Sequence, residues 1–473
     1  MRGRVRGYMN GMDRLRDHLV REYKKKTKKS RAVFHRAEKV MIAGGSHTIR
    51  LWRPYPFFAT RAEGPAVRDA DGNWYTDYWQ GHYANVLGHN PRLIRREIAA
   101  SLDRGALHTG FEASHQIELA ELILSRLGYQ NERLRFTTSG TLATMYSVML
   151  AEGFTGRDLV LKIGGGWHGA SPYLLKGVKF HPGSGFEGDE SAGVLEDILR
   201  RTLITRFNDC EDLKRILKEK GDRIACFILE PFLGVGGFLP ASREYLTLAR
   251  ELTAKYGIVL IFDEVVSGFR FVPSGLQVAY GVRPDLTVFG KIIGGGHAVA
   301  AVVGRSDIME GCESGKGFRG RVRFDGGTFS AHSEYMKAGL IMLRHLIRNA
   351  ASIYPRLAQS GEKLRTGVER VFAAEGVPAM CTGGGNDVIP GSSMIMVHFP
   401  TGETALRSPE DLHDERRSNV QLREDLLKLA LLVHNVNVVH GGGAISTTHR
   451  KADLERTIEA YGEAARLFKK FLF

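Results

Sequence analysis

Short apolar runs alternate with helix-like segments through the middle of the chain, from about residue 76 to residue 333. Most of these runs are bounded by Gly or Pro, and they read RLRFTT, DLVLKI, ACFILE, IVLIFDE, DLTVFGK and AVAAVVG. Apolar strands that alternate with helices are typical of βαβ units in a parallel sheet buried on both faces. The pattern therefore predicts an α/β fold with a large, mostly parallel sheet in a domain spanning residues 76–333.

The last part of the chain, residues 334–473, has a different pattern. Helical periodicity at 334–375 and 451–470 flanks two short strand-like runs, MIMVHF and VNVVH. Nearer the N-terminus, residues 40–75 include DADGNWYTDYW, whose Asp-Gly pair is typical of a hairpin turn. We expect a smaller α+β domain at 334–473, which the segment 40–75 joins.

The composition is that of an ordinary globular protein, with 43% hydrophobic and 25% charged residues among 473. The four cysteines are far apart and form no C-x-x-C pair, so we expect no metal site and no disulfide framework. No apolar run is long enough to span a bilayer, and the N-terminus lacks the apolar core of a secretory signal. These features predict a cytoplasmic protein without a membrane segment.

The net charge of +14 is concentrated at the N-terminus. Residues 1–39 contain 14 basic and 4 acidic residues, which predicts a basic N-terminal arm. Such an arm could contact polyanions through their phosphates, but a solvated helix explains it more simply. We therefore do not expect nucleic acid as a partner, and a nucleic-acid-binding function is kept only as a remote alternative.

Two ionisable residues stand at the ends of neighbouring apolar runs in the predicted sheet. Asp263 lies at the end of IVLIFDE, and Lys291 ends DLTVFGK. Ligands of open α/β sheets bind outside the carboxyl ends of the strands, so both side chains could face one crevice. Burial lowers the pKa of a lysine, and its neutral amine can form a Schiff base with a carbonyl. An ion pair that merely closes the end of the sheet explains the spacing equally well.

A third feature is the stretch RFTTSGTLATM, in which a strand leads through Ser139, Gly140 and Thr141 into a helix. A helix N-terminus with small hydroxyl residues suits a phosphate, although ordinary capping by Ser139 would explain it alone. Together, a phosphate cradle, a strand-end acid and a strand-end lysine match the needs of pyridoxal 5'-phosphate. We therefore predict this cofactor.

The order of motifs along the chain carries a family resemblance that spans nearly everything after residue 33. The motifs include FHRAEKVMIAGG, VRDADGNWYTDYW, VLGHNP, SGTLATM, GGWHGAS, ILEP, DEVVSGFR, PDLTVFGKIIGGG, GGTFSAH and ISTTH. The chain resembles the class III aminotransferases, pyridoxal-phosphate enzymes of fold type I, and among them it is most similar to the glutamate-1-semialdehyde 2,1-aminomutases. The resemblance implies a large sheet domain and a smaller α+β domain.

The resemblance also implies roles for the residues already singled out. Lys291 would bind the cofactor covalently and later move a proton, and Asp263 would pair with the pyridinium nitrogen. Ser139, Gly140 and Thr141 would hold the phosphate.

Three further positions follow from the same resemblance. Trp167 would stack on the cofactor ring and Val265 would pack on its other face, although both could be plain core residues. Thr328 would reach the phosphate of a neighbouring subunit, which implies a homodimer with shared active sites.

The substrate end of the site is less well defined by sequence. Arg50 would bind the substrate carboxylate, because a guanidinium suits a bidentate contact, but it could also be a surface arginine. His47 and Tyr83 are candidates for the same pocket.

The chain departs from the aminomutase pattern at Val235, Gly441 and Leu142, where that pattern has polar residues. An aminomutase must retain its intermediate while the amino group moves, whereas an aminotransferase releases a keto product and admits a second substrate. The departures favour an aminotransferase acting on a carboxylated amine, such as a β-amino acid, and a keto acid. An aminomutase or related isomerase is the alternative.

A G-x-G-x-x-G spacing at Gly164, Gly166 and Gly169 raises a dinucleotide-binding alternative. That fingerprint requires a helix opening on the glycines, whereas Pro172 follows almost at once. We therefore reject the dehydrogenase interpretation.

Overall fold

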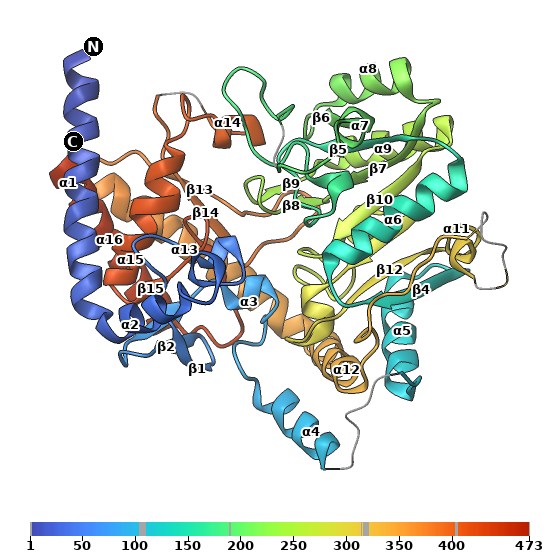
Figure 1. The fold of residues 1–473 in the computed structure, drawn as a ribbon, viewed down its shortest axis with the longest axis horizontal. Helices are drawn as coiled ribbons and strands as arrows, with labels where there is room; N and C mark the ends of the chain where they lie inside the picture. Colours follow the sequence, from blue (N-terminus) through green and yellow to red (C-terminus); the bar gives the residue numbers. More distant parts are fainter. Residues whose placement is uncertain are drawn as a thin grey trace.

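The computed structural model describes residues 2–103, 110–188, 191–313, 315, 321–402 and 405–472. Figure 1 shows two groups of elements side by side. One is a large sheet with its helices, drawn mainly in cyan, green and yellow. The other is built from both ends of the chain, in blue and red, and both marked termini lie there.

A seven-stranded sheet forms the centre of the larger group (Figure 1). In order across the sheet, its strands are β4 (Glu132–Thr137), β12 (Ala300–Arg305), β11 (Leu286–Phe289), β10 (Val259–Glu264), β7 (Ile224–Leu229), β5 (Leu159–Ile163) and β6 (Thr202–Thr205). β12 is antiparallel to both of its neighbours, and the other neighbouring pairs are parallel. The predicted α/β class with a mostly parallel sheet is confirmed, although the edge strand β6 was not among the predicted strands.

Helices cover both faces of this sheet. The main ones are α5 (Ser114–Leu127), α6 (Gly140–Thr155), α8 (Cys210–Lys220), α9 (Arg243–Tyr256) and α12 (Ser333–Arg348). In β10, Leu260 and Phe262 join the apolar cluster of α8 and α9, whereas Val259 and Ile261 join the cluster of α6. Because side chains alternate along a strand, each central strand is buried on both faces, which explains its unbroken apolar sequence.

The smaller group combines the two ends of the chain. Its helices are α13 (Ala350–Ala374), α15 (Lys428–Val433) and α16 (Lys451–Leu472), and its strands are β1 (Ala59–Glu63), β2 (Ala66–Asp69), β3 (Trp74–Asp77), β13 (Met380–Thr382), β14 (Met394–His398), β15 (Val436–Asn437) and β16 (Gly443–Ala444). β2 and β3 form the hairpin expected at the Asp-Gly pair, and β15 pairs with β3 in parallel. Strands from both ends of the chain therefore share one sheet.

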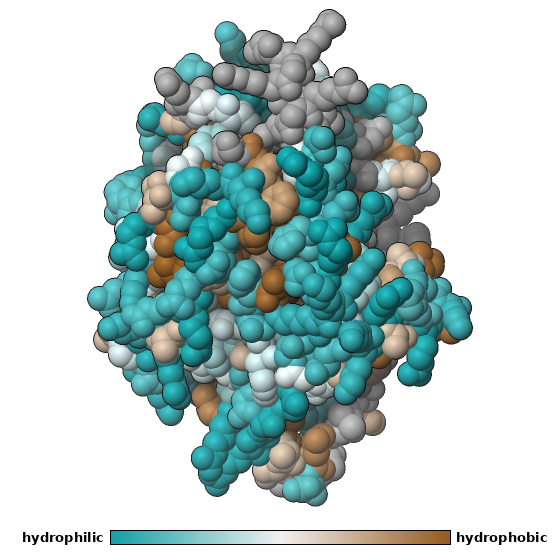
Figure 2. All heavy atoms as spheres, turned by 90° about the vertical axis from the view of Figure 1, so that its left-hand side faces the viewer, coloured by the Kyte–Doolittle hydropathy of each residue, from teal (hydrophilic) through white to brown (hydrophobic). Residues whose placement is uncertain are grey.

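The basic N-terminal segment forms two helices, α1 (Arg2–Lys26) and α2 (Lys28–Ala37). One face of α1 is buried against α15 and α16, because Leu15, Leu19 and Tyr23 have no exposed area. Figure 2 shows the side of the molecule on which α1 lies, and its described surface is mainly hydrophilic. The segment is therefore a packed part of the fold whose charged face meets solvent.

Lys26 at the end of α1 has a structural use for its charge. Its Nζ donates to the carbonyls of Leu432 and Val433, at 2.9 and 3.0 Å, and to the side chain of Asn435 at 2.5 Å. The last carbonyls of a helix lack partners within it, and a cation stabilises them. Lys26 thus fastens α1 to the C-terminus of α15.

The four cysteines are free thiols. Among the described helices, none combines the length and the apolar character needed to cross a membrane.

Candidate active site

A cavity of about 400 Å³ lies at the carboxyl ends of β10 and β11. It is lined by Arg50, Gly81, His82, Ala84, Thr138, Ser139, Gly140, Thr141, Trp167, His168, Gly169, Glu230, Asp263, Val265, Val266, Lys291, Gly296, His297, Ala298 and Val299. β10 and β11 are parallel neighbours, so the acid near the end of one and the lysine just after the other reach the same cavity. The sequence-based expectation of one shared crevice at this edge agrees with that placement.

Asp263 is held by two hydrogen bonds deep in the cavity. Its Oδ2 lies 2.8 Å from Nδ1 of His168, and its Oδ1 accepts the Val265 N–H at 3.0 Å. Burial lowers the pKa of His168 below its usual value, although the charge of Asp263 opposes the shift. A neutral imidazole can donate Nδ1–H to a carboxylate, so the contact fits a histidine whose charged form is disfavoured by burial. Among the described residues, the side chain that binds the Asp263 carboxyl group is therefore His168. The alternative, an ion pair between Asp263 and Lys291 at the end of the sheet, is not formed.

Lys291 has the features of a reactive amine. Burial lowers the pKa of its ammonium group, while the charges of Asp263 and Glu230 partly oppose that shift. Its backbone is left-handed, with φ of 48°, directly after Gly290. For a residue other than glycine, this conformation is strained by roughly 1–3 kcal/mol, and it persists only where the surrounding structure imposes it. The fold therefore holds Lys291 in this conformation.

The N-terminus of α6 forms an anion cradle. Ser139 caps the helix by accepting the Leu142 N–H at 3.3 Å, and Ala143 makes the first helical bond to the Ser139 carbonyl at 3.1 Å. The amides of Gly140 and Thr141 precede that bond, so a bound phosphate can accept from them at the positive end of the helix dipole.

Two glycines show how tightly this cradle is built. A Cβ at Gly169 would lie 2.3 Å from Oγ1 of Thr141, so the loop that carries Trp167 touches the cradle directly. A Cβ at Gly140 would lie 3.1 Å from the methyl groups of Val265. Trp167 and Val265 both line the cavity, and the concave space that remains between these segments suits a flat phosphorylated ring.

Val265 also packs against the residue before the lysine. A Cβ at Gly290 would lie 3.2 Å from Cγ1 of Val265. Val265 therefore sets the spacing between the start of α6 and Lys291, which gives it a packing role as well as a place in the cavity wall.

Glu230 is a site residue that the sequence reasoning missed. It is 3% exposed, and its carboxyl oxygens accept the N–H groups of Trp167 and Gly234, each at 3.0 Å. Burial, followed by the charge of Asp263, raises the pKa of Glu230 to about 8. The sequence contained a signal for it, namely an acidic residue at the end of an apolar run. Glu230 directly follows β7, and Asp263 lies at the same end of β10.

The substrate end of the cavity differs from the expectation in detail. Arg50 is exposed and lines the cavity, and His47 is exposed with its ring centroid 5.2 Å from that of His82. Tyr83 is not among the lining residues, because its ring packs against Phe238 at 5.6 Å. His82, which no sequence motif singled out, lines the cavity instead.

Thr328 lies outside this cavity. It is exposed in the single chain, and its neighbour Phe329 is 58% exposed.

The glycines of the rejected dinucleotide motif lead from β5 into the Trp167 loop and then to a short 3-10 turn at Pro172–Leu174, with no helix opening on them.

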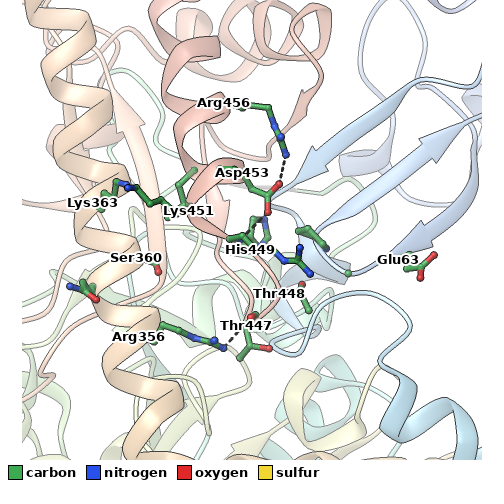
Figure 3. A pocket seen from close by; sticks show the side chains of 16 residues that line it. Glu63, Arg356, Ser360, Lys363, Thr447, Thr448, His449, Lys451, Asp453 and Arg456 are labelled. Carbon is green, nitrogen blue, oxygen red and sulfur yellow. Dashed lines mark hydrogen bonds and ion pairs between the residues drawn. The ribbon is translucent and has the colours of Figure 1, made fainter.

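A larger cavity lies elsewhere, between α13 and the start of α16 (Figure 3). It has about 1120 Å³, and two of its arginines have partners within the chain: Arg456 pairs with Asp453, and Arg356 donates to the Thr447 carbonyl. Its lysines, Lys363 and Lys451, are exposed residues of helices. Hydrated amines of this kind are poor nucleophiles, so we place the chemistry in the smaller cavity.

The smaller cavity combines a partly buried lysine, a carboxylate held by a histidine and a helix N-terminus, all at one edge of a doubly covered sheet. This fold and donor set define a pyridoxal-phosphate-dependent enzyme of fold type I. The sequence also matches the family described as aminotransferase class-III over residues 50–386, so the chain belongs to that family.

Comparison with individual proteins agrees with this assignment. The chain is 35% identical, over 443 residues, to a glutamate-1-semialdehyde 2,1-aminomutase of Methanosphaera stadtmanae, covering 92% of this chain and 97% of that protein. Its fold is similar to that of an omega-transaminase from Sphaerobacter thermophilus, with a TM-score of 0.82, 31% identity and coverage of 92% and 97%. A beta-phenylalanine aminotransferase from Variovorax paradoxus gives a TM-score of 0.80, 30% identity and coverage of 95% and 96%.

Proposed function

We propose that this chain is an aminotransferase that exchanges an amino group between a carboxylated amine, such as a β-amino acid, and a keto acid. The observation that carries the proposal is the shared cavity of Lys291, whose pKa is lowered, and Asp263, which His168 holds in place. The alternative is an aminomutase, which moves the amino group between adjacent carbons of glutamate-1-semialdehyde.

The residues of the cavity divide the chemical work. When bound, pyridoxal phosphate supplies an electron-withdrawing ring that stabilises the negative charge left on the substrate carbon after proton loss. The amides of Gly140 and Thr141 would bind its phosphate, and the Asp263 carboxylate would hold its ring nitrogen protonated. Nζ of Lys291 would take the proton from the substrate carbon and deliver it to the cofactor carbon that keeps the amino nitrogen, which a neutral amine in a partly buried site can do.

Gly441 supports exchange rather than migration of the amino group. It stands where the aminomutase pattern has an acid, and its backbone φ is 73°. A Cβ at Gly441 would lie 2.8 Å from Cγ of Arg423, so that side chain already fills the space an acid would need. Leu142 and Val235 likewise replace polar residues of that pattern, although none of the three positions lines the cavity that contains Lys291.

We propose in addition that Arg50 binds the substrate carboxylate and that the enzyme is a homodimer in which Thr328 reaches the neighbouring subunit's phosphate. Exposure of Phe329 beside Thr328 supports a surface that a second copy covers. Light scattering should give the mass of a dimer, and a fully active monomer would contradict the proposal. The free thiols support a reducing compartment, which we propose is the cytoplasm.

The experiment for the reaction uses the purified holoenzyme with a keto acid and a panel of α-, β- and ω-amino acids. We expect chromatography to detect the keto product from at least one carboxylated amine, and no product from Lys291→Ala. Efficient conversion of glutamate-1-semialdehyde to 5-aminolevulinate without a keto acceptor would replace our proposal with the aminomutase alternative.

A further inference from the structure

A turn with unusual backbone geometry borders the active-site cavity. Gln80, Gly81, His82 and Tyr83 have φ angles of 46°, 61°, 58° and 71°, so four consecutive residues are left-handed. Residues with a Cβ visit this region rarely and singly, because the Cβ crowds the following carbonyl. A left-handed turn with three such residues therefore requires support from the rest of the fold.

Asp77, at the end of β3, supplies the first support. Its carboxylate accepts the N–H groups of Trp79 at 3.1 Å and Gln80 at 2.9 Å, and the Gln80 side chain donates back to the Asp77 carbonyl at 2.8 Å. His89 and Asn437 each approach the same carboxylate to 2.7 Å. Asp77 is 2% exposed, so the start of the turn is fixed to a rigid, buried network.

Arg270 supplies the second support, at the end of the turn. Arg270 is 2% exposed, and its guanidinium donates to the carbonyl of Tyr83 and lies 3.5 Å from Oγ of Ser393. Within the described residues, no ion pair joins Arg270 to a carboxylate. Burying a guanidinium without a carboxylate partner costs free energy. The buried position of Arg270 beside this turn therefore indicates that the residue has a specific role there.

The turn places His82 against the cavity. His82 and Arg50 both line the space that contains Lys291. The His82 ring lies 4.8 Å from that of Trp79 and 5.2 Å from that of His47, measured between centroids. Burial, followed by the charges of Arg50 and His47, lowers the pKa of His82 to about 4, so its imidazole is neutral at physiological pH.

We propose that the turn at residues 80–83 is the specificity element of this site, and that it fixes His82 beside Arg50 to bind the carboxylate of the amine substrate. Arg50 supplies the charge, and the neutral imidazole of His82 donates a directional hydrogen bond. Arg270 is a positioning residue that acts through Tyr83. This inference rests on the proposed aminotransferase function and deepens it, because it names the turn and the residue that act with Arg50 to select amines that carry a carboxylate.

The experiment compares 3-aminobutanoate with 2-aminobutane, in which a methyl group replaces the carboxylate. In the holoenzyme, His82→Phe should raise KM for 3-aminobutanoate about tenfold, the loss expected for one hydrogen bond to a charged group. KM for 2-aminobutane should rise clearly less than KM for 3-aminobutanoate, because 2-aminobutane has no carboxylate for His82 to contact. His82→Asn, which keeps a donor, should recover most of the loss.

Two further variants separate positioning from general damage. Arg270→Lys keeps the positive charge but loses the planar guanidinium with its several N–H donors. This variant should show a reduced preference for 3-aminobutanoate, and its cofactor absorbance should stay that of the wild type. His35→Phe, an exposed residue of α2, should leave both substrates unaffected.

The outcomes distinguish this inference from the function on which it rests. If wild-type enzyme prefers 3-aminobutanoate and His82→Phe retains that preference, the role of His82 is refuted and the aminotransferase proposal stands. Equal increases in KM for both amines also refute it. If the wild-type enzyme converts neither amine nor any other amino acid, the proposed function fails and this inference fails with it.

Discussion

The buried carboxyl group of Glu230 gives a prediction about stability and pH. Its pKa is raised from 4.5 to about 8, by burial first and then by the charge of Asp263. The folded protein therefore binds this proton more tightly than the unfolded chain does. Below pH 4.5 both states carry it, and between pH 4.5 and 8 only the folded state does, so the stability of the wild type should fall as the pH rises through that interval.

The magnitude follows from the size of the shift. One pH unit corresponds to about 1.36 kcal/mol, so a shift of about 3.5 units sets an upper limit of about 5 kcal/mol on this contribution. Glu230→Gln cannot ionise and should lack the slope. Because its amide accepts only one of the two N–H groups of Trp167 and Gly234, it should lose about 1–3 kcal/mol at low pH. The wild type should be the more stable protein at pH 5, and the variant should equal or exceed it above about pH 7.

The assay is denaturant unfolding of the cofactor-free protein from pH 5 to pH 8.5, followed as the difference between wild type and variant. Taking the difference removes the contributions of the other titrating groups. Glu211→Gln serves as the control, because that side chain is 83% exposed on α8 and should follow the wild type at every pH. A difference for Glu230→Gln that stays constant with pH would show that Glu230 is ionised in the folded protein and would refute the reasoning.

Three more predictions concern the fold and the cofactor site. Leu19→Ala should lower the free energy of unfolding by about 2–5 kcal/mol, because Leu19 has no exposed area. Lys24→Ala, at an exposed position of the same helix, should change it by no more than about 0.5 kcal/mol. Equal effects of the two substitutions would mean that α1 does not contribute to stability. Asp263→Asn should lower kcat about 100-fold or more without unfolding the protein, and wild-type turnover would exclude the proposed role of its charge. Gly169→Ala should weaken cofactor binding in a spectroscopic titration, because its Cβ would clash with the phosphate cradle. Gly183→Ala should leave cofactor binding unchanged, because Gly183 also has a positive φ but a Cβ there would have no atom within 4 Å.

The sequence was most informative where chemistry and regular structure coincide. Asp263 and Lys291 could be predicted because a parallel sheet brings the carboxyl ends of its strands to one edge, and both residues lie beside such an end. Glu230 obeys the same rule at the end of β7 and could have been found by it. The edge strand β6 was missed because TLIT is short and lacks the continuous apolar run of the central strands.

Other features could not be predicted from local sequence. The buried face of α1 is formed by Leu15, Leu19 and Tyr23 at steps of four, but the surrounding basic residues dominate the composition. The left-handed turn before Ala84 depends on Asp77 and on Arg270, which lies nearly two hundred positions further along the chain. Such a conformation is imposed by tertiary contacts against local preference, so no propensity or motif identifies it.

The segment that begins with β10 connects the two halves of the candidate site. Asp263 meets His168 at the cofactor end, Val265 sets the spacing between the start of α6 and Gly290, and Arg270 holds the turn that presents His82. A shift of this segment would therefore move the cofactor contacts and the substrate contacts together. Because neighbours in one network act non-additively, substitutions at Val265 and Arg270 should couple in their effects on the preference for carboxylated amines, even though only one of them lines the cavity.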